Sequence, residues 1–425
     1  MNYNACMKKE YRARIVDTLL EKKLAAKGAV LIEGPKWCGK TTTASMHAGS
    51  ILRVDEPISK EQNLRMARIN PQKLLEGKTP RLLDEWQIAP TLWDTVRYEV
   101  DKRGTMGQYI LTGSAVPADT SLISHSGTGR FSWLMMRPMS LFESGDSTGE
   151  VSIESLFAGN ADVAGENSLS LDDIAFLLCR GGWPQAVGLP TEIALQQAID
   201  YYDGVVHSDI NRADGIKKNP ERVIKIMKSY ARSMGSQAPN TTIAKDVAAD
   251  DETVKTYINA LKRIFVVEDM TAWNPNLRSK SAIRTADTRY YVDPSIATAS
   301  LGVGPNDLIN DLATFGLFFE TLCVRDLRVF AEKLGGSVYH YRDNTNLECD
   351  AVIHLRNGSY GLIEIKLGGE DLVNEGAKNL QALRERIDTT KMKEPSFLMV
   401  LIGVGKYAYR REDGVLVVPI GCLRD

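Results

Sequence analysis

Long apolar runs are missing from this chain of 425 residues, and none approaches the ~20 residues that a membrane span needs. The basic start of the chain, residues 1–14, is followed by neither the apolar stretch nor the small-residue cleavage site of a secretory signal. These absences argue against a membrane or secreted protein. We therefore expect a cytoplasmic protein without a membrane partner.

Paired cysteines and a strong net charge are also missing. The six cysteines show no C-x-x-C spacing, which argues against a zinc ribbon and a disulfide framework and predicts free thiols. They are Cys6, Cys38, Cys179, Cys323, Cys349 and Cys422. The net charge of -2 gives no global sign of nucleic-acid binding, so any such function must depend on local patches.

A phosphate-binding loop is present. Residues 34–42 read G-x-x-x-x-G-K-T and follow an apolar run at 29–33. Glycine at the two bends lets backbone N–H groups approach a triphosphate, Lys40 is expected to reach its β and γ phosphates, and Thr41 to place its hydroxyl on Mg²⁺. The pattern predicts an ATP site at a helix start. The predicted nucleotide-binding residues are Gly34, Pro35, Lys36, Trp37, Cys38, Gly39, Lys40, Thr41 and Thr42.

Two later strand ends carry polar residues that fit the same site. The apolar run 81–83 ends in Asp84 and Glu85, of which Asp84 is expected to hold Mg²⁺ and Glu85 to polarise the attacking water. Thr112 and Ser114 end the next strand. Because the C-terminal ends of parallel strands meet at one edge, they would lie level with Asp84 and could sense the γ-phosphate. A plain strand-end turn explains these two equally well.

Three arginines are candidates for contact with phosphate. Arg130 follows the third core strand and could stabilise transition-state charge on the nucleotide of a neighbouring subunit, with Arg137 as the second candidate. A surface arginine is the commoner outcome for both. Arg180 precedes the break at 181–184 in a helical region and is a weaker candidate.

Residues 241–261 have the pattern of a helix-turn-helix followed by a strand, which is typical of a winged helix. Between residues 212 and 289 the chain has 15 Lys+Arg against 9 Asp+Glu. Lys255, Thr256 and Asn259 would face DNA from the second helix. The acidic residues 250–252 would repel phosphate, and a protein-docking module fits the pattern equally well.

Two predicted C-terminal strands carry a third set of polar residues. Asp350 begins one strand, and Glu364 and Lys366 stand two apart on the next, so both point to the same face. Converging carboxylates make a hard-oxygen site for Mg²⁺ or Mn²⁺, with Glu320 of the preceding helix as a further ligand. The lysine could orient the attacking water. The alternative is a solvated strand face with an ion pair.

Together these motifs resemble the bacterial and archaeal AAA-type ATPases that carry a C-terminal PD-(D/E)xK nuclease-like domain. The resemblance covers nearly the whole chain and rests on the motifs at 34–42, 83–87, 111–114, 181–184, 242–247, 253–257, 319–320, 348–350 and 364–366. It implies that Asp350, Glu364 and Lys366 are a nuclease-like triad and that the protein forms a ring, with a hexamer expected. Trp37 and Cys38 depart from this group, where small or polar residues are commoner.

We therefore expect an α/β P-loop core of AAA type at 1–165, an α-helical lid at 166–215, a winged helix at 216–300 and an α/β restriction-endonuclease-like domain at 301–425. The predicted function is ATP hydrolysis coupled to action on DNA, including branched or junction DNA, with a metal-dependent nuclease-like C-terminal domain. The alternative is a signalling or scaffold NTPase whose winged helix and inactive nuclease-like domain dock protein partners.

Overall fold

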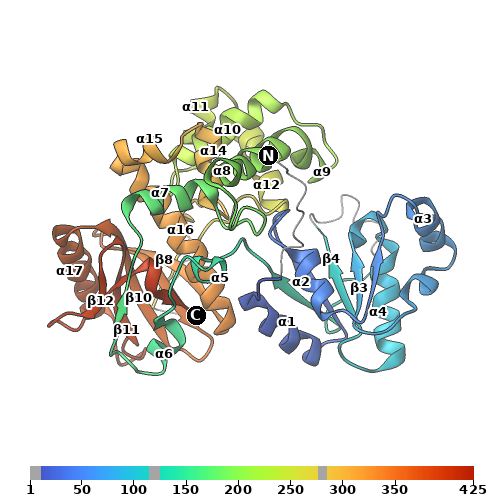
Figure 1. The fold of residues 1–425 in the computed structure, drawn as a ribbon, viewed down its shortest axis with the longest axis horizontal. Coiled ribbons are helices and arrows are strands. Elements are labelled where there is room, and N and C mark those ends of the chain that lie inside the picture. The colour runs from blue at the N-terminus through green and yellow to red at the C-terminus, as the bar shows by residue number, and fades with distance from the viewer. Residues whose placement is uncertain (1–10, 114–124, 276–284) are drawn as a thin grey trace.

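The computed structural model describes residues 11–113, 125–275 and 285–425 (Figure 1). Cys6 and Ser114, two residues of the sequence predictions, lie outside these ranges. The other five cysteines are free thiols, as predicted, and all five are buried. Among the described helices, none is both long enough and apolar enough to cross a membrane.

The N-terminal region is built around a five-stranded parallel sheet with the strand order β2-β3-β4-β1-β5. Its strands are β1 (Ala29–Glu33), β2 (Ser50–Arg53), β3 (Arg81–Asp84), β4 (Tyr109–Thr112) and β5 (Phe131–Met135). The helices are α1 (Ile15–Ala26), α2 (Lys40–His47), α3 (Lys60–Ile69) and α4 (Thr91–Arg103), with short turns η1 (Pro71–Leu75) and η2 (Trp86–Ile88). The strands are apolar almost throughout because one core lies under α1 and α2 and another under α3 and α4.

A helical region lies above both sheets in Figure 1. Its helices are α7 (Leu171–Arg180), α8 (Thr191–Gly204), the π-helical turn η4 (Val205–Asp209), α9 (Ile210–Arg212), α10 (Pro220–Arg232), α11 (Asn240–Val247), α12 (Asp251–Arg263), α14 (Pro294–Leu301) and α15 (Pro305–Asn310). Antiparallel bridges join Val267 to Tyr291 and Met270 to Thr288. The helix-turn-helix elements are thus present, and the winged-helix assignment stays a prediction.

These helices share one apolar core. Tyr201 of α8, Ile226 of α10 and Ile296 of α14 belong to the same buried cluster. Helix α14 packs on α7, α8 and α10. The boundary expected at residue 215, between a lid and a winged helix, therefore does not correspond to a gap in the packing.

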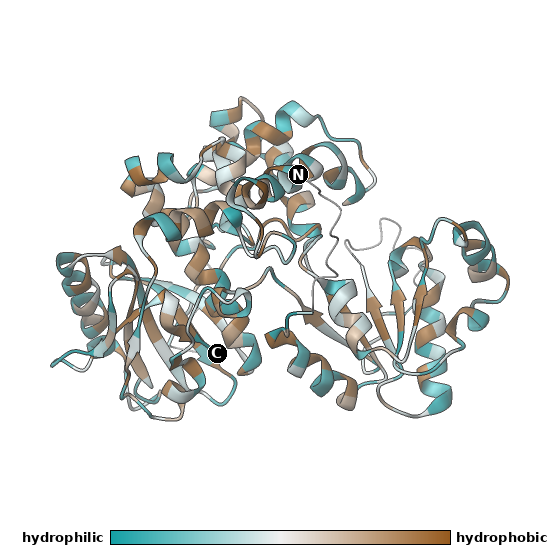
Figure 2. Cartoon of the chain, viewed as in Figure 1, coloured by the Kyte–Doolittle hydropathy of each residue, from teal (hydrophilic) through white to brown (hydrophobic). Residues whose placement is uncertain are grey.

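The C-terminal region is a seven-stranded mixed sheet with the strand order β7-β12-β13-β11-β10-β9-β8. It contains β8 (Gly336–Arg342), β9 (Glu348–Leu355), β10 (Tyr360–Gly368), β11 (Phe397–Val404), β12 (Tyr407–Arg410) and β13 (Leu416–Pro419), followed by η5 (Ile420–Cys422). Helix α16 (Leu312–Lys333) covers one face and α17 (Glu370–Arg386) the other. The strands are largely brown and the outer side of α17 is teal in Figure 2, as expected for a sheet buried between helices.

The segment 143–170, expected to be an irregular connection, belongs in part to the C-terminal region. Strand β6 (Val151–Ser152) pairs with β14 (Leu423–Arg424), and β7 (Gly165–Glu166) pairs with β12. Short helices α5 (Leu141–Ser144) and α6 (Ile153–Phe157) accompany them. The boundary expected at residue 165 therefore cuts through chain that pairs with the C-terminal strands. Two-residue strands give no periodic signal in a sequence, which explains the error.

The break at 181–184 is a structural junction. The amide of Gly182 donates to Asp293 Oδ2 at 2.9 Å, and its carbonyl accepts from the Met139 amide at 2.7 Å. Arg325, fully buried on α16, donates to the same Asp293 oxygen at 2.9 Å and also pairs with Asp326. Asp326 in turn accepts from the Leu141 amide at 2.8 Å. The chain leaving the N-terminal sheet is thereby fixed to α16.

We predict that Gly182→Ala lowers the free energy of unfolding by about 1–3 kcal/mol, the usual range for overpacking a buried site. A Cβ at this position would lie 2.2 Å from the Met139 carbonyl oxygen, which is backbone and cannot move aside cheaply. The matched control is Gly316→Ala in α16, where a Cβ meets nothing within 4 Å and a helical alanine is favoured. Urea unfolding of both variants measures the difference. Equal stability of the two would contradict the junction.

Candidate functional site: the phosphate-binding loop and the C-terminal carboxylates

The loop after β1 has the backbone that a phosphate cradle needs. Gly34 and Gly39 have φ angles of +148° and +104°, which favour glycine. A Cβ on Gly34 would lie 2.0 Å from the Met136 carbonyl oxygen, so no other residue fits there. Lys40 begins α2, and its Nζ donates to the Gly34 and Pro35 carbonyls at 2.7 Å each. Phosphate oxygens would compete for these protons.

Asp84 joins the loop to two neighbouring strands. Its Oδ1 accepts from Thr41 Oγ1 at 2.8 Å and from Thr112 Oγ1 at 2.6 Å. The register explains this meeting, because Thr112 at the end of β4 lies opposite both Asp84 of β3 and Ile32 of β1. The structure thus brings together three residues that were predicted from separate motifs. Their hard oxygens fit Mg²⁺ when it is bound with a triphosphate.

Glu85 follows directly in a left-handed conformation, with φ 56° and ψ 41°. Burial raises the pKa of Glu85, although a hydrogen bond from Gln87 Nε2 to its Oε2, at 2.5 Å, acts in the opposite direction. Gln87 also packs closely on Gly113, where a Cβ would lie 2.4 Å from its amide oxygen. Gln87 was not predicted as a site residue, although it stands within the acidic motif at 83–87.

Arg14 is a further residue that the sequence did not indicate. Its buried guanidinium donates to the Cys38 carbonyl at 2.8 Å, to the Arg137 carbonyl at 2.9 Å and to Glu143 Oε1 at 2.9 Å. The amide of Ile15 donates to the same carboxylate oxygen at 2.8 Å. An arginine in a basic N-terminal stretch gives no signal of burial, since its partner Glu143 is 129 residues away.

The helical region contacts the outer side of the loop. Lys36 forms an ion pair with Asp209, the last residue of the π-helical turn η4. The Trp37 ring centroid lies 6.1 Å from that of Tyr201, which in turn stacks on Trp183 at 4.1 Å. Loop and helices are therefore in direct contact. This contact agrees with the position expected for a lid, but does not by itself show one.

None of the three candidate arginines reaches the loop of its own chain through its side chain. Arg130 directly precedes β5 and therefore lies where the parallel strands begin, whereas the loop lies where β1 ends. It pairs with Asp101 at 2.8 Å. Arg137 pairs with Glu268 and Glu332 at 2.6 and 2.8 Å. Arg180 is buried against Asp146 at 2.7 Å. Carboxylates of the same chain already hold the guanidinium groups of Arg137 and Arg180, and the phosphate contacts suggested for these two residues stay predictions. A role of Arg130 toward a neighbouring subunit stays a prediction.

The C-terminal residues lie on adjacent strands, as predicted. Lys366 Nζ is 2.8 Å from Glu364 Oε2 and 3.7 Å from Asp350 Oδ2, and Asp350 accepts from the Ile365 amide at 2.7 Å. Burial and the Asp350 charge raise the pKa of both Glu320 and Glu364. Glu320 accepts a hydrogen bond from the Tyr290 hydroxyl. Glu320, Asp350 and the loop at 235–237 line a cavity of about 100 Å³.

The predicted metal site of Glu320, Asp350 and Glu364 stays a prediction. Within the described ranges, no group of three or more His, Cys, Asp or Glu side chains is arranged to hold a metal ion. Glu320 comes from α16 on one face of the sheet, whereas Glu364 lies against Gly376 of α17 on the other. The ammonium of Lys366 lies beside Glu364 and Asp350 and pairs with both carboxylates. One buried Glu364 oxygen, Oε1, has no hydrogen-bond partner.

Comparison with protein families identifies the N-terminal region. Residues 26–144 match the family model described as an AAA domain. The chain contains an AAA-type ATPase domain. After the AAA domain, residues 171–307 match one domain of unknown function (DUF8612) and residues 315–423 another (DUF4143). The first of these models spans both the expected lid and the expected winged helix.

The similarity to two mycobacterial proteins covers most of the chain. Uncharacterized proteins of Mycobacterium tuberculosis (Rv2008c) and Mycobacterium bovis (Mb2031c) are each 22% identical over 398 residues, covering 92% of this chain and 79% of theirs. Among solved structures, the Walker-type ATPase PABY2304 of Pyrococcus abyssi is 14% identical, with a TM-score of 0.42, covering 69% of this chain and 97% of that one.

We predict that ATP hydrolysis falls on acidification with a midpoint above the ordinary glutamate pKa of about 4.3, because burial raises the pKa of Glu85. A base must be deprotonated to accept a proton, so activity is present above its pKa and is lost as the pH falls through it. A pH–rate profile measures the midpoint.

The control is Glu85→Gln, which should bind ATP but hydrolyse it roughly 10²–10⁴-fold more slowly, without the acidic limb. A variant that keeps the wild-type rate and profile would remove Glu85 from the role of base.

Proposed function

We propose that this protein is a Mg²⁺-dependent ATPase that acts on DNA, with branched or junction DNA as the preferred substrate. The observation that carries the ATPase part is the meeting of Thr41 and Thr112 on one oxygen of Asp84, beside the loop of the AAA domain. Thr41 and Asp84 would hold Mg²⁺, which neutralises phosphate charge when bound. Lys40 binds the β and γ phosphates, and Glu85 takes the proton of the attacking water.

Contacts of the AAA domain with the helical region and with α16 support the proposal that ATP hydrolysis affects the rest of the chain. Arg137 follows β5 of the AAA domain and pairs with Glu268, beside the β-bridges, and with Glu332 at the end of α16. Burial would raise the pKa of Glu268, but Arg137 and Arg328 lower it to about 2, so the carboxylate is ionised over the physiological range. A movement of β5 would therefore pull on both partners.

The DNA part of the proposal rests on the helices after residue 216. Lys255, Thr256 and Asn259 are all exposed on α12, as a recognition helix requires. We assign binding rather than cleavage to the C-terminal domain. Lys366 neutralises Glu364 and Asp350 there, and the described side chains form no metal cluster.

Self-association into a ring, with a hexamer expected, is part of the same proposal. Arg130 is exposed beside β5, which is an edge strand of its sheet. From there it could extend toward the nucleotide of a neighbouring subunit, where a positive charge stabilises the transition state. For this role, Arg130 would have to leave its ion pair with Asp101 and bind phosphate instead.

A signalling or scaffold NTPase is the second candidate. The acidic residues Asp250, Asp251 and Glu252 at the start of α12 would repel a DNA backbone. In this case, α12 and the C-terminal domain would dock protein partners, and ATP would switch the affinity for them.

We predict that DNA raises the ATPase rate severalfold or more, and that four-way junctions do so at lower concentration than duplex or single strands. The physical reason is that nucleic acid would bind the helical region, which contacts the ATP loop through Lys36 and Asp209. Initial rates of phosphate release against each DNA structure measure the effect, together with gel shifts at several salt concentrations.

Lys40→Ala is the control for the source of the activity, since it removes the phosphate contact without changing the helical region. No stimulation and no salt-sensitive shift with any of the three DNA structures would reject the DNA hypothesis and favour the scaffold.

A further inference from the structure

One face of α10 is basic along most of its length. Arg222, Lys225, Lys228 and Arg232 are spaced by three, three and four residues, which places them on one side of a helix. All four are exposed. The other side carries buried apolar residues that belong to the core of the helical region, namely Val223, Ile226, Met227 and Tyr230. We call the four exposed residues the basic face of α10.

Acidic neighbours neutralise the basic face only in part. Glu221 is the only acidic residue in α10. Within the described parts of the chain, the one ion pair of the face joins Arg232 to Asp246 at 3.9 Å, and the Arg232 side chain is 71% exposed. Pairs of this kind contribute little stability. Asp250 lies near Arg222, but its low pKa comes chiefly from Thr253.

The basic residues of α12 are more often engaged by carboxylates. Lys255 lies 3.5 Å from Glu252, and Lys262 lies 2.6 Å from Asp269. The start of α12 is acidic, whereas α10 has four cations against one carboxylate. The stronger positive field is therefore on α10 rather than on α12.

We propose that the basic face of α10 binds the DNA phosphate backbone. This inference rests on the proposed function and names the surface that would contact its substrate. From Arg222 to Arg232 the helix rises about 15 Å, and one strand of DNA presents a phosphate every ~3.4 Å of its axis, so the four cations can meet a short run of phosphates. Such contacts hold the backbone and read no sequence.

An acidic protein partner is a poorer match for this face. Protein interfaces are depleted in lysine and anchored by aromatic side chains. The exposed residues of α10 are Glu221 and the four cations, and its only aromatic residue, Tyr230, is buried. A polyanion with regularly spaced charges satisfies this surface better.

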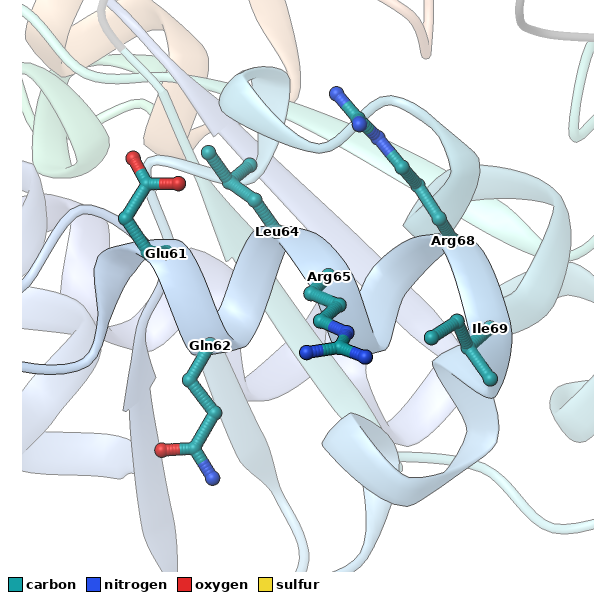
Figure 3. A pocket seen from close by; sticks show the side chains of 6 residues that line it. All are labelled: Glu61, Gln62, Leu64, Arg65, Arg68 and Ile69. Atoms are coloured by element: carbon teal, nitrogen blue, oxygen red, sulfur yellow. The ribbon is translucent and has the colours of Figure 1, made fainter.

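The test compares two sets of charge-removing substitutions in the full chain. The first is Arg222→Gln, Lys225→Gln, Lys228→Gln and Arg232→Gln together. The control is Arg65→Gln with Arg68→Gln on α3 of the AAA domain, two exposed arginines beside an open pocket of about 630 Å³ (Figure 3). Circular dichroism and the ATPase rate without DNA check that both variants are folded.

Affinity for a duplex of about 30 base pairs and for a four-way junction is measured between about 50 and 200 mM salt. The slope of log K against log salt is negative, and each phosphate that the protein no longer neutralises lowers its magnitude by about 0.9. We expect the magnitude of the slope of the α10 variant to fall by about 3–4 and its affinity at about 50 mM salt to fall at least tenfold. The α3 variant should match the wild type. If the quadruple variant unfolds, the magnitude of the slope of Lys225→Gln with Lys228→Gln should fall by about 2.

Three results would overturn the inference. Wild-type slopes in the α10 variant with DNA-stimulated ATPase intact would reject this surface and leave the proposed function standing. An equal loss in the α3 variant would show that any positive charge suffices. Failure of the wild type to bind either DNA, with binding to polyglutamate retained, would reject both this inference and the DNA function in favour of an acidic protein partner.

Discussion

A buried guanidinium fixes the ATP loop to the rest of the chain. Arg14 binds the carbonyls of Cys38 in the loop and of Arg137 after β5, and its charge is balanced by Glu143. Both side chains of the ion pair are almost fully shielded, at 4% and 2% exposure. Loss of one partner from such a pair typically costs about 3–5 kcal/mol, because the other charge stays buried without compensation. The loop geometry therefore depends on a residue outside its own motif.

Helix α16 continues this connection toward the C-terminal sheet. Glu332 near its end pairs with Arg137, Asp326 in its middle accepts from the Leu141 amide, and Glu320 in its first half accepts from Tyr290. The same helix covers one face of the C-terminal sheet. An ordered helix that contacts the AAA domain at one end and the carboxylate cluster at the other is suited to transmit a change between them. Under the proposed function, ATP binding would act on the C-terminal region through this helix.

The sequence predicted strands β1, β3 and β4 of the N-terminal sheet and β9 and β10 of the C-terminal one, because these runs are apolar and carry polar residues at their ends. It did not predict β11, β12 and β13. The positions of Lys40, Thr41, Asp84 and Thr112 followed from motif spacing, and the hydrogen bonds to Asp84 join three of them. The AAA assignment was confirmed by the family comparison. The DNA function, the ring and the roles of Arg130 and of the C-terminal triad stay predictions.

Other features could not be found in this way because they depend on contacts between distant residues. Nothing in the sequence near Arg14 indicates that its side chain is buried and paired with Glu143. Likewise, nothing in 143–170 indicates that two short strands pair with β12 and β14. The arrangement of the C-terminal carboxylates depends on packing in the same way. Spacing places Glu364 and Lys366 on one face, but only packing shows that Glu320 approaches from the other side and that Lys366 lies against the carboxylates.

Hydrogen exchange of the full chain, with and without ATP, measures this coupling. ATP should change amide protection in α16 as well as in the loop at 34–42, while α17, on the opposite face of the C-terminal sheet, should stay unchanged. In Arg137→Gln, which breaks the link to Glu332 and Glu268, the change in α16 should disappear while that in the loop is kept. Protection changes confined to the AAA domain in the wild type would show that α16 does not carry the effect of ATP.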